Sequence, residues 1–143
     1  MSVSYWMIEG IGLIANDIAH RIDRAKAAKF LYEQFPERQD VDEVCRSKDF
    51  GVDAICNYGG FDNFADVLCH CDETDTLTYG DDGEGVCYFY YPPSMPWHRM
   101  ANEPDSEEEV VERIIRAVQK ITDMSRSEIR EQINFDVYAV GCG

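Results

Sequence analysis

The pattern of hydrophobic and polar positions changes its period several times along this chain. Two stretches carry apolar residues at steps of three and four, the spacing of the buried stripe of an amphipathic helix. The first stripe comprises Ile18, Ile22, Ala25, Ala28, Tyr32 and Phe35. The second comprises Val110, Ile114, Ala117, Val118 and Ile121. The pattern therefore predicts two long helices.

Polar residues at the ends of these stretches indicate where the helices begin and end. Asn16 or Asp17 could cap the first helix, and Pro36 closes it. The second helix follows a capping box of Ser106 and Glu109. Along its outer face we expect the i,i+4 ion pairs Glu109–Arg113 and Glu112–Arg116. Shorter helical spacing predicts a helix over residues 61–69 and another after the capping box Ser125–Glu128.

Four segments rich in aromatic and β-branched residues predict strands: 3–9, 77–79, 86–91 and 135–140. The second and third are joined by residues 80–85, whose three glycines indicate a hairpin loop. Gly10 and Gly12 suggest a bend or a close approach of backbone after the first strand. Residues 37–60 and 92–105 show no regular period, and Pro92, Pro93 and Pro96 end the third strand.

The predicted elements do not alternate strictly between strand and helix, which favours the α+β class. We expect a single domain over residues 1–143, with a mainly antiparallel sheet of about four strands and two long helices packed on one face. The terminal strands could pair in the centre of this sheet. Apolar residues make up 45% of the chain, enough for a core.

No apolar run approaches the roughly 20 residues that cross a bilayer. The first apolar stretch, residues 3–15, is interrupted by Glu9 and lacks a basic leader, so we expect no secretory signal. On that expectation the six cysteines, Cys45, Cys56, Cys69, Cys71, Cys87 and Cys142, are predicted to be reduced thiols in a cytoplasmic protein. Most of them should be buried.

The charge changes this picture, because the net value of −15 is concentrated in the middle of the chain. Residues 1–35 and 110–143 each balance their acids and bases, whereas residues 36–71 carry eight acids against three bases. Residues 72–109 carry eleven acids and one base, Arg99. Such a surface repels nucleic acid and anionic membranes, so neither is an expected direct partner.

The densest group of metal-capable side chains is Cys69, His70 and Cys71, which Cys87 or His98 could complete as a zinc site. The spacing lacks a C-x-x-C pair, and Cys69 and Cys71 could share an ion only if the chain were extended there. The alternative is two buried thiols at a helix end beside an exposed histidine. The acids of residues 72–84 could hold calcium, although the EF-hand pattern is absent; a solvated turn is the alternative.

Catalytic chemistry has little support in the sequence. A nucleophilic cysteine needs a lowered thiol pKa, and the acids around Cys69 and Cys71 act in the opposite direction. No phosphate-binding loop, dinucleotide fingerprint, serine elbow or metalloprotease helix is present. We therefore predict no cofactor and leave enzymatic activity open.

An aromatic and proline-rich stretch runs from Tyr88 to Trp97. Because both faces of the strand 86–91 carry aromatic side chains, either the strand is central or one aromatic row is exposed. Exposed tyrosine and tryptophan would serve as interface anchors. The alternative is that the tyrosines belong to the core.

Three segments, SVSYWMIEGIGL, LCHCDETDTLTYGDDGEGVCYFYYPPSMPW and YAVGCG, resemble the small acidic proteins carried by phages and prophages of gut Firmicutes. That population includes anti-CRISPR proteins and other DNA mimics, which occupy the nucleic-acid groove of a host protein. The resemblance rests on the general character of these segments and implies no particular functional residue.

The leading hypothesis is an acidic binding protein, and specifically an inhibitor that mimics nucleic acid and docks on a basic protein surface through residues 72–109. A cation-binding module around residues 69–87 and an accessory domain with incidental acidity are the alternatives. The predicted binding residues are Asp72, Glu73, Asp75, Asp81, Asp82, Glu84, Tyr90, Trp97, Glu107 and Glu108.

Overall fold

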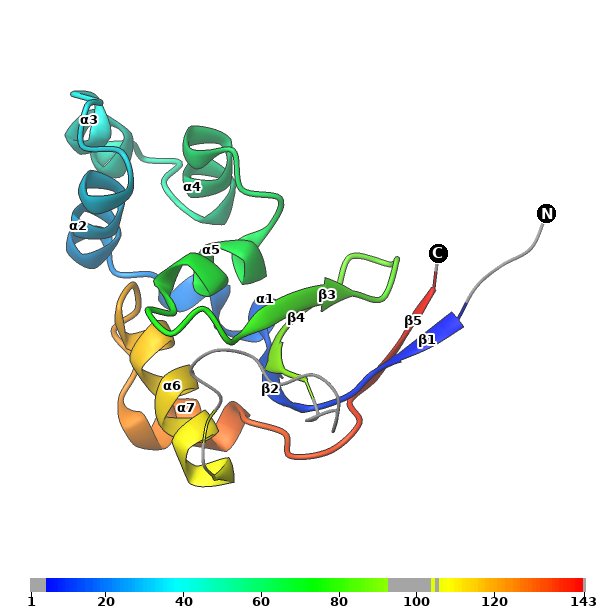
Figure 1. Cartoon of the computed structure of the whole chain (residues 1–143). Coiled ribbons are helices and arrows are strands. Elements are labelled where there is room, and N and C mark those ends of the chain that lie inside the picture. Colours follow the sequence, from blue (N-terminus) through cyan, green and yellow to red (C-terminus); the bar gives the residue numbers. More distant parts are fainter. Residues whose placement is uncertain (1–4, 93–103, 105, 143) are drawn as a thin grey trace.

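The structure is a computed structural model that describes residues 5–92, 104 and 106–142. Its amino-terminal half contains β1 Tyr5–Ile8, β2 Ile11–Ile14, α1 Ala15–Ile18, the 3-10 helix η1 Ala19–Arg21, α2 Arg24–Gln34, α3 Val41–Arg46, α4 Val52–Gly59 and α5 Phe64–Cys71. The remainder contains β3 Thr78–Asp81, β4 Cys87–Tyr91, α6 Glu107–Gln119, α7 Arg126–Gln132 and β5 Ala139–Cys142. The predicted α+β class is confirmed (Figure 1).

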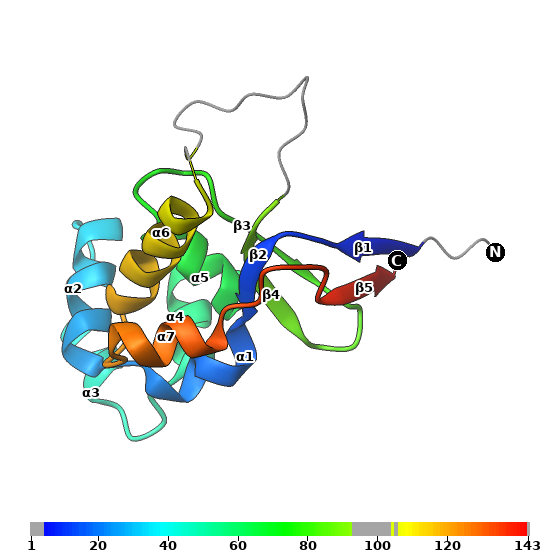
Figure 2. The ribbon, with the colours of Figure 1, turned by 90° about the horizontal axis from the view of Figure 1, so that it is seen from below.

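The strands of the described chain form two antiparallel sheets, so the prediction of one sheet of about four strands is wrong. One sheet has the order β2-β4-β3, and the other pairs β1 with β5. The terminal strands therefore do pair with each other, but in a separate ribbon and not at the centre of the main sheet. The ribbon projects away from the helices, and both termini lie at its far end (Figure 2). The split falls at Gly10, whose φ of +143° turns the chain between β1 and β2.

The main sheet is covered by α5 and α6, with α1 against β4. The prediction that both long helices pack on the sheet is wrong for α2, which packs mainly against α3 (Figure 1). The core is continuous between these layers and includes Leu13, Phe30, Phe89 and Ile114, which are all at most 1% exposed. No helix in the described part of the chain is long and apolar enough to cross a membrane.

The predicted first long helix is interrupted. Helix α2 starts only at Arg24, and its cap is Asp23, whose carboxylate accepts a hydrogen bond from Lys26 N at 3.0 Å. Asn16, one of the two predicted caps, instead bridges to the β3–β4 hairpin. Its side chain donates to Gly85 O at 3.0 Å and accepts from Cys87 N at 2.7 Å. A long-range contact has replaced the expected local cap.

Two further predictions of secondary structure are corrected. Residues 37–60, expected to be irregular, contain the short helices α3 and α4. The last strand is not at 135–140: it begins at Ala139, and Phe135 and Val137 precede it with 47% of their surfaces exposed. Alternation of apolar residues over 135–139 therefore does not mark a half-buried strand here. Residues 93–103 and 105, most of the predicted irregular loop, lie outside the described residues.

The aromatic strand β4 is the central strand of the main sheet, which resolves the two alternatives for it. Tyr88, Phe89 and Tyr91 are buried, as members of a core. Gly12 on β2 allows the close approach: a Cβ at this position would lie 2.3 Å from Phe89 O and 2.4 Å from Tyr90 Cβ. The expectation that Gly12 marks a close backbone approach is confirmed.

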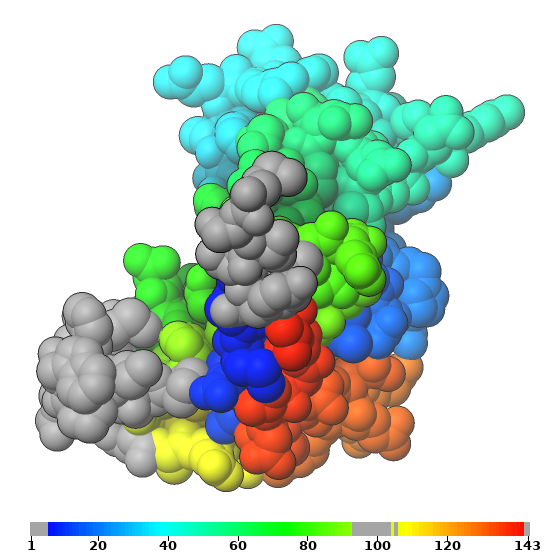
Figure 3. All heavy atoms as spheres, turned by 90° about the vertical axis from the view of Figure 1, so that its right-hand side faces the viewer, coloured from blue at the N-terminus to red at the C-terminus, as the bar shows by residue number. Residues whose placement is uncertain are grey.

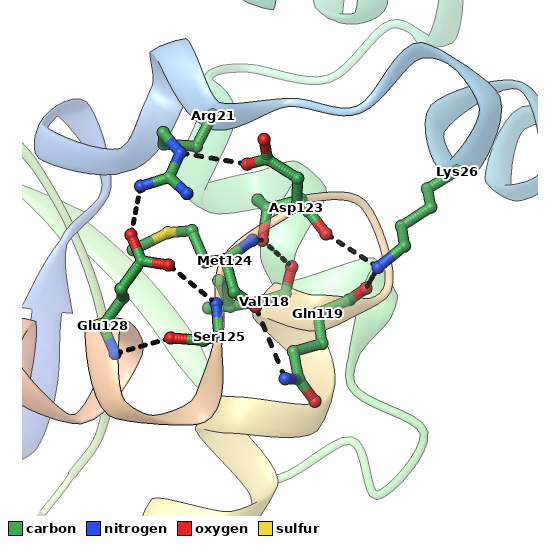
Figure 4. A network of polar contacts seen from close by, with 9 residues as sticks. Arg21, Lys26, Val118, Gln119, Asp123, Met124, Ser125 and Glu128 are labelled. Atoms are coloured by element: carbon green, nitrogen blue, oxygen red, sulfur yellow. Dashed lines mark hydrogen bonds and ion pairs between the residues drawn. The ribbon is translucent and has the colours of Figure 1, made fainter.

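The turn between α6 and α7 is tied to the amino-terminal half by charged side chains (Figure 4). Arg21 donates to Asp123 at 2.9 Å and to Glu128 at 2.5 Å. Lys26 donates to the backbone carbonyls of Gln119 and Thr122, at 3.1 Å and 2.9 Å. Gln119 is the last residue of α6, where a cation is electrostatically favoured, and Thr122 follows the end of the helix.

The capping signals around α6 and α7 are partly confirmed. Ser125 and Glu128 form the full predicted capping box of α7. At α6 the Ser106 side chain accepts from Glu109 N, and the Glu109 carboxylate pairs with Arg113 as predicted. The predicted Glu112–Arg116 pair is wrong, because the Glu112 carboxylate pairs with Arg126 of α7.

Candidate functional site

The predicted binding residues are distributed over several separate places. Asp72 is 8% exposed, and its carboxylate accepts hydrogen bonds from Thr74 N and Oγ1, Thr76 N and Leu77 N at 2.6–3.0 Å. It therefore organises the loop between α5 and β3 and does not contribute to an exposed patch. This loop is linked to α6 by a hydrogen bond, because Thr76 Oγ1 accepts from the buried guanidinium of Arg113 at 3.0 Å.

Cations from the carboxyl-terminal part of the chain lie beside two other predicted residues. Glu108 makes a bidentate pair with Arg130 of α7, with both distances 2.9 Å. Glu73, which is 86% exposed, lies 3.6 Å from Lys120. Glu107 is exposed in the first turn of α6, where the helix dipole favours a carboxylate. These glutamates belong to a surface of mixed charge.

The acids of the hairpin lie at the other end of β3. Asp81 accepts from Gly83 N at 2.8 Å, and Asp82 accepts from Glu84 N at 2.8 Å. Four strand residues, roughly 13 Å, separate them from the loop that holds Asp72 and Asp75. Among the described residues of the segment 72–109, the hairpin acids therefore lie apart from Asp72 and Asp75. Tyr90 is half-buried against Tyr138, with ring centroids 5.8 Å apart, and Trp97 lies outside the described residues.

A different acidic surface comes from a segment that contains no Lys or Arg. From Asp49 to His98 the sequence has ten Asp and Glu and no base other than His70 and His98. Its described part folds into α4, α5, β3 and β4, and α5 contacts the other three. Figure 3 shows the yellow-green hairpin directly beside the blue-green atoms of this helical part. We call the carboxylates that the next two paragraphs connect the acidic face: Asp53, Asp62, Asp66, Asp81 and Asp82.

Hydrogen bonds join part of the acidic face directly. The Tyr79 hydroxyl of β3 donates to Asp62 at 2.7 Å, and Asp62 N donates to the Asp66 carboxylate at 3.0 Å. The bond to Asp62, burial and the charge of Asp66 together raise the pKa of Tyr79 to about 12.

The remaining carboxylates of the acidic face lie close to two cysteines, Cys56 and Cys87, because their charges act on the pKa of these thiols. Burial, followed by the charges of Asp53 and Asp66, raises the pKa of Cys56 to about 11. Burial together with Asp81 and Asp82 raises the pKa of Cys87, which also acts on Cys56. Within the described residues no Lys or Arg pairs with Asp53, Asp62 or Asp81, and the imidazole of His70 lies 3.4 Å from the Asp66 carboxylate. The acidic face thus gathers carboxylates on one flank of α5, three of them without a Lys or Arg partner in the described part of the chain.

Among the described residues the predicted metal ligands are not brought together, and His98 lies outside these residues. Cys69 and Cys71 lie in the last turn of a helix, where residues two apart point to different sides. The His70 ring packs on Phe61 at 4.9 Å, and its Nδ1 lies 2.9 Å from Asp66 O. Among the described residues no three His, Cys, Asp or Glu side chains are arranged to hold a metal ion. The calcium alternative would use the carboxylates of Asp81 and Asp82. In the structure these carboxylates accept hydrogen bonds from backbone amides of their own turn.

The same cysteines have the protonation state of inert thiols. Burial raises the pKa of both Cys69 and Cys71 to about 12, with neighbouring acids adding to the effect at Cys69. A thiol with such a pKa is a poor nucleophile at neutral pH. The geometry around Cys69, His70 and Cys71 therefore gives no support to a Cys–His catalytic pair.

Sequence reasoning identified two members of the acidic face, Asp81 and Asp82, but missed Asp53, Asp62 and Asp66. The 50-residue run without Lys or Arg, residues 49–98, could have indicated these three residues. Counting the charges over residues 36–71 and 72–109 divides this run into two parts. Comparison of the chain with protein-family models, curated proteins and solved structures finds no match in any of the three.

Proposed function

We propose that this protein is an acidic binding protein whose acidic face docks on a basic protein surface and competes there with nucleic acid. The observation that carries the proposal is the fold of the base-free segment: its carboxylates from α4, α5 and the β3–β4 hairpin lie together, and Asp53, Asp62 and Asp81 have no Lys or Arg partner among the described residues.

Two physical arguments support this role. Like charges gathered on one surface destabilise the folded state, so a region that keeps them uncompensated is a candidate for function. Grooves that bind nucleic acid are lined with Lys and Arg, because duplex DNA carries one charge per roughly 1.7 Å. A group of neighbouring carboxylates offers such a groove the same sign of charge as nucleic acid and speeds association through electrostatic steering.

The sequence resemblance to phage proteins that include DNA mimics agrees with this proposal. Cys45, Cys56, Cys69, Cys71 and Cys87 are free thiols, which supports a reducing compartment such as the cytoplasm as the place of action. The partner is expected to be a basic, nucleic-acid-binding protein, and direct contact with nucleic acid or membrane is not part of the proposal.

The test compares two triple variants with the same net charge. The face variant is Asp53→Asn, Asp62→Asn and Asp81→Asn, which keeps the side-chain oxygens that accept hydrogen bonds. The control variant is Glu37→Gln, Glu131→Gln and Asp136→Asn, all exposed positions outside the acidic face. Wild type and both variants are immobilised, and proteins retained from a lysate are identified at salt concentrations from about 50 to about 500 mM.

We expect wild type and control to retain the same Lys- and Arg-rich protein, the face variant to lose it, and retention to fall at least about tenfold across the salt range. Duplex DNA should then displace the purified partner. Equal retention by the face variant, or a partner insensitive to salt and DNA, would contradict the proposal.

A further inference from the structure

A pocket of about 510 Å³ lies on the other flank of α5, between α2, α6 and the loop that follows α5. Its volume is within the range of roughly 300–1,000 Å³ typical of sites for small organic ligands. Two helical stripes line it with the same spacing. Helix α2 contributes Lys26, Lys29, Phe30 and Glu33, and the α6 side contributes Arg113, Arg116, Ala117 and Lys120. Residues spaced i, i+3, i+4 and i+7 share one side of a helix.

The charge of this pocket is opposite to that of the protein. Five of the thirteen Lys and Arg in the chain line it, together with only three acids, Glu33, Asp72 and Glu73. The pocket therefore has a surplus of two positive charges in a protein whose net charge is −15. A concave site concentrates this potential, because its low-dielectric walls focus the field.

Two of the five cations have structural partners. Lys26 binds the carbonyls of Gln119, at the end of α6, and of Thr122 beyond it, and Arg113 donates to Thr76 at 3.0 Å and to Glu109 at 3.0 Å. Arg113 is 7% exposed, and with Thr76 and Asp72 it forms a hydrogen-bonded network of buried polar residues at the pocket. A network of this kind holds the pocket wall in one geometry before any ligand arrives.

Three cations remain for a ligand. Lys29 is exposed and forms no ion pair with any described residue. Arg116 is also exposed, and its guanidinium has one long contact, 3.4 Å from Nε to Glu112 O. Lys120 lies 3.6 Å from both Glu33 and Glu73, longer than an ordinary hydrogen bond. An incoming anion could displace Glu73, which is 86% exposed, from Lys120.

We infer that this pocket binds the phosphate monoester of a small organic molecule, with the phosphate held by Lys29, Arg116 and Lys120. A phosphate monoester carries a charge of about −2 at neutral pH, which matches the surplus of the pocket. Phe30 and Ala117 supply an apolar wall for the organic part. The pocket is far larger than a phosphate ion needs, so an organic body contributes to binding.

The test uses AMP and glucose 6-phosphate as phosphate esters, with adenosine, inorganic phosphate and citrate as comparison probes. Binding is measured by the rise in Tm and by amide chemical shifts at ligand concentrations up to about 10 mM. The pocket variant is Lys29→Ala with Arg116→Ala. The control variant is Arg46→Ala with Lys48→Ala, which removes two exposed cations outside the pocket.

We expect at least one phosphate ester to bind saturably, more tightly than inorganic phosphate and citrate, whereas adenosine does not bind. The pocket variant should lose affinity at least tenfold while its Tm without ligand stays within a few degrees of wild type. The control variant should bind as wild type does. The inference is overturned if neither ester binds, if citrate binds more tightly than both esters, or if the pocket variant keeps the wild-type affinity.

Discussion

The acidic face and the cationic pocket lie on different flanks of the same helix, α5. Burial raises the pKa of both Cys69 and Cys71, but the strongest charge acting on Cys69 is Asp66 of the acidic face, whereas the strongest charge acting on Cys71 is Lys120 of the pocket. The pocket gathers five cations, whereas Asp53, Asp62 and Asp81 of the acidic face pair with no Lys or Arg among the described residues. A net charge of −15 therefore hides a separation of charge between the two flanks.

The two flanks also differ in how their carboxylates are used. On the pocket side Asp72 is buried and accepts four hydrogen bonds, so its charge stabilises the loop that follows α5. On the acidic face, Asp53, Asp62 and Asp81 are exposed. An acid in this sequence is thus a structural element on one side and a candidate contact on the other.

The largest effect should come from breaking the pocket side at Asp72. Asp72→Ala removes the acceptor of four hydrogen bonds and leaves the buried amides of Thr76 and Leu77 without it. We expect the free energy of unfolding to fall by about 3 kcal/mol, because hydrogen bonds to charged groups are worth about 1.5–3 kcal/mol each and are only partly replaced by water. Urea denaturation measures the change.

The neighbouring exposed acid provides the control for this prediction. Glu73→Ala should change the stability by less than about 0.5 kcal/mol, as surface substitutions usually do. If both variants lose the same stability, the distinction drawn between a structural and a surface carboxylate in this loop is wrong.

A smaller effect is expected from neutralising the acidic face. The variant with Asp53→Asn, Asp62→Asn and Asp81→Asn should raise the Tm by about 1–3 °C at low salt, because it relieves repulsion between like charges. The rise should shrink as salt screens the wild-type charges. Differential scanning calorimetry at low and high salt measures both quantities, and the control triple variant should show a smaller rise. A fall in Tm at low salt would contradict an uncompensated face.

The smallest effect concerns the ion pair of Arg21 and Glu128, beside the pocket-lining Lys26 (Figure 4). Hydrogen bonds from Arg21 and from the backbone of Ser125 lower the pKa of Glu128 to about 2, below its usual value near 4.5. A depressed pKa in the folded state stabilises the protein above the ordinary pKa, and this contribution disappears as the pH falls toward 2.

We therefore expect the Tm difference between wild type and Glu128→Gln to be greatest above pH 4.5 and to shrink between pH 4.5 and 2. Thermal unfolding recorded across this range checks the prediction. A Tm difference between wild type and Glu128→Gln that does not depend on pH would show that the charge of Glu128 makes no contribution to stability through this ion pair.

Local signals in the sequence were reliable where the contacts that decide them are also local. The capping box Ser125–Glu128, the pair Glu109–Arg113 and the β3–β4 hairpin all join residues close in the chain. Predictions failed where distant residues compete for the same group. Asn16 was expected to cap a helix but bonds to Gly85 and Cys87, and Glu112 was expected to pair with Arg116 but binds Arg126.

The candidate sites follow the same rule. An acidic excess in the middle of the chain could be counted in advance, but the charges that neutralise Glu108 come from α7, a distant segment. The cationic pocket could not be predicted, because Lys29 and Arg116 lie on helices separated by more than 70 residues. Each helix by itself shows only an ordinary mixed surface, and the pocket exists only where the two meet.

The sequence by itself determined the α+β class, the positions of the main hairpin and of α6 and α7, and the amount and sign of the charge. Periodicity, caps and composition act over a few residues, so they can be read from the chain directly. Only the tertiary structure decided which acids are buried, paired or left exposed, and which cations face one pocket. Electrostatic interactions depend on distance in space, and folding sets that distance independently of separation along the chain.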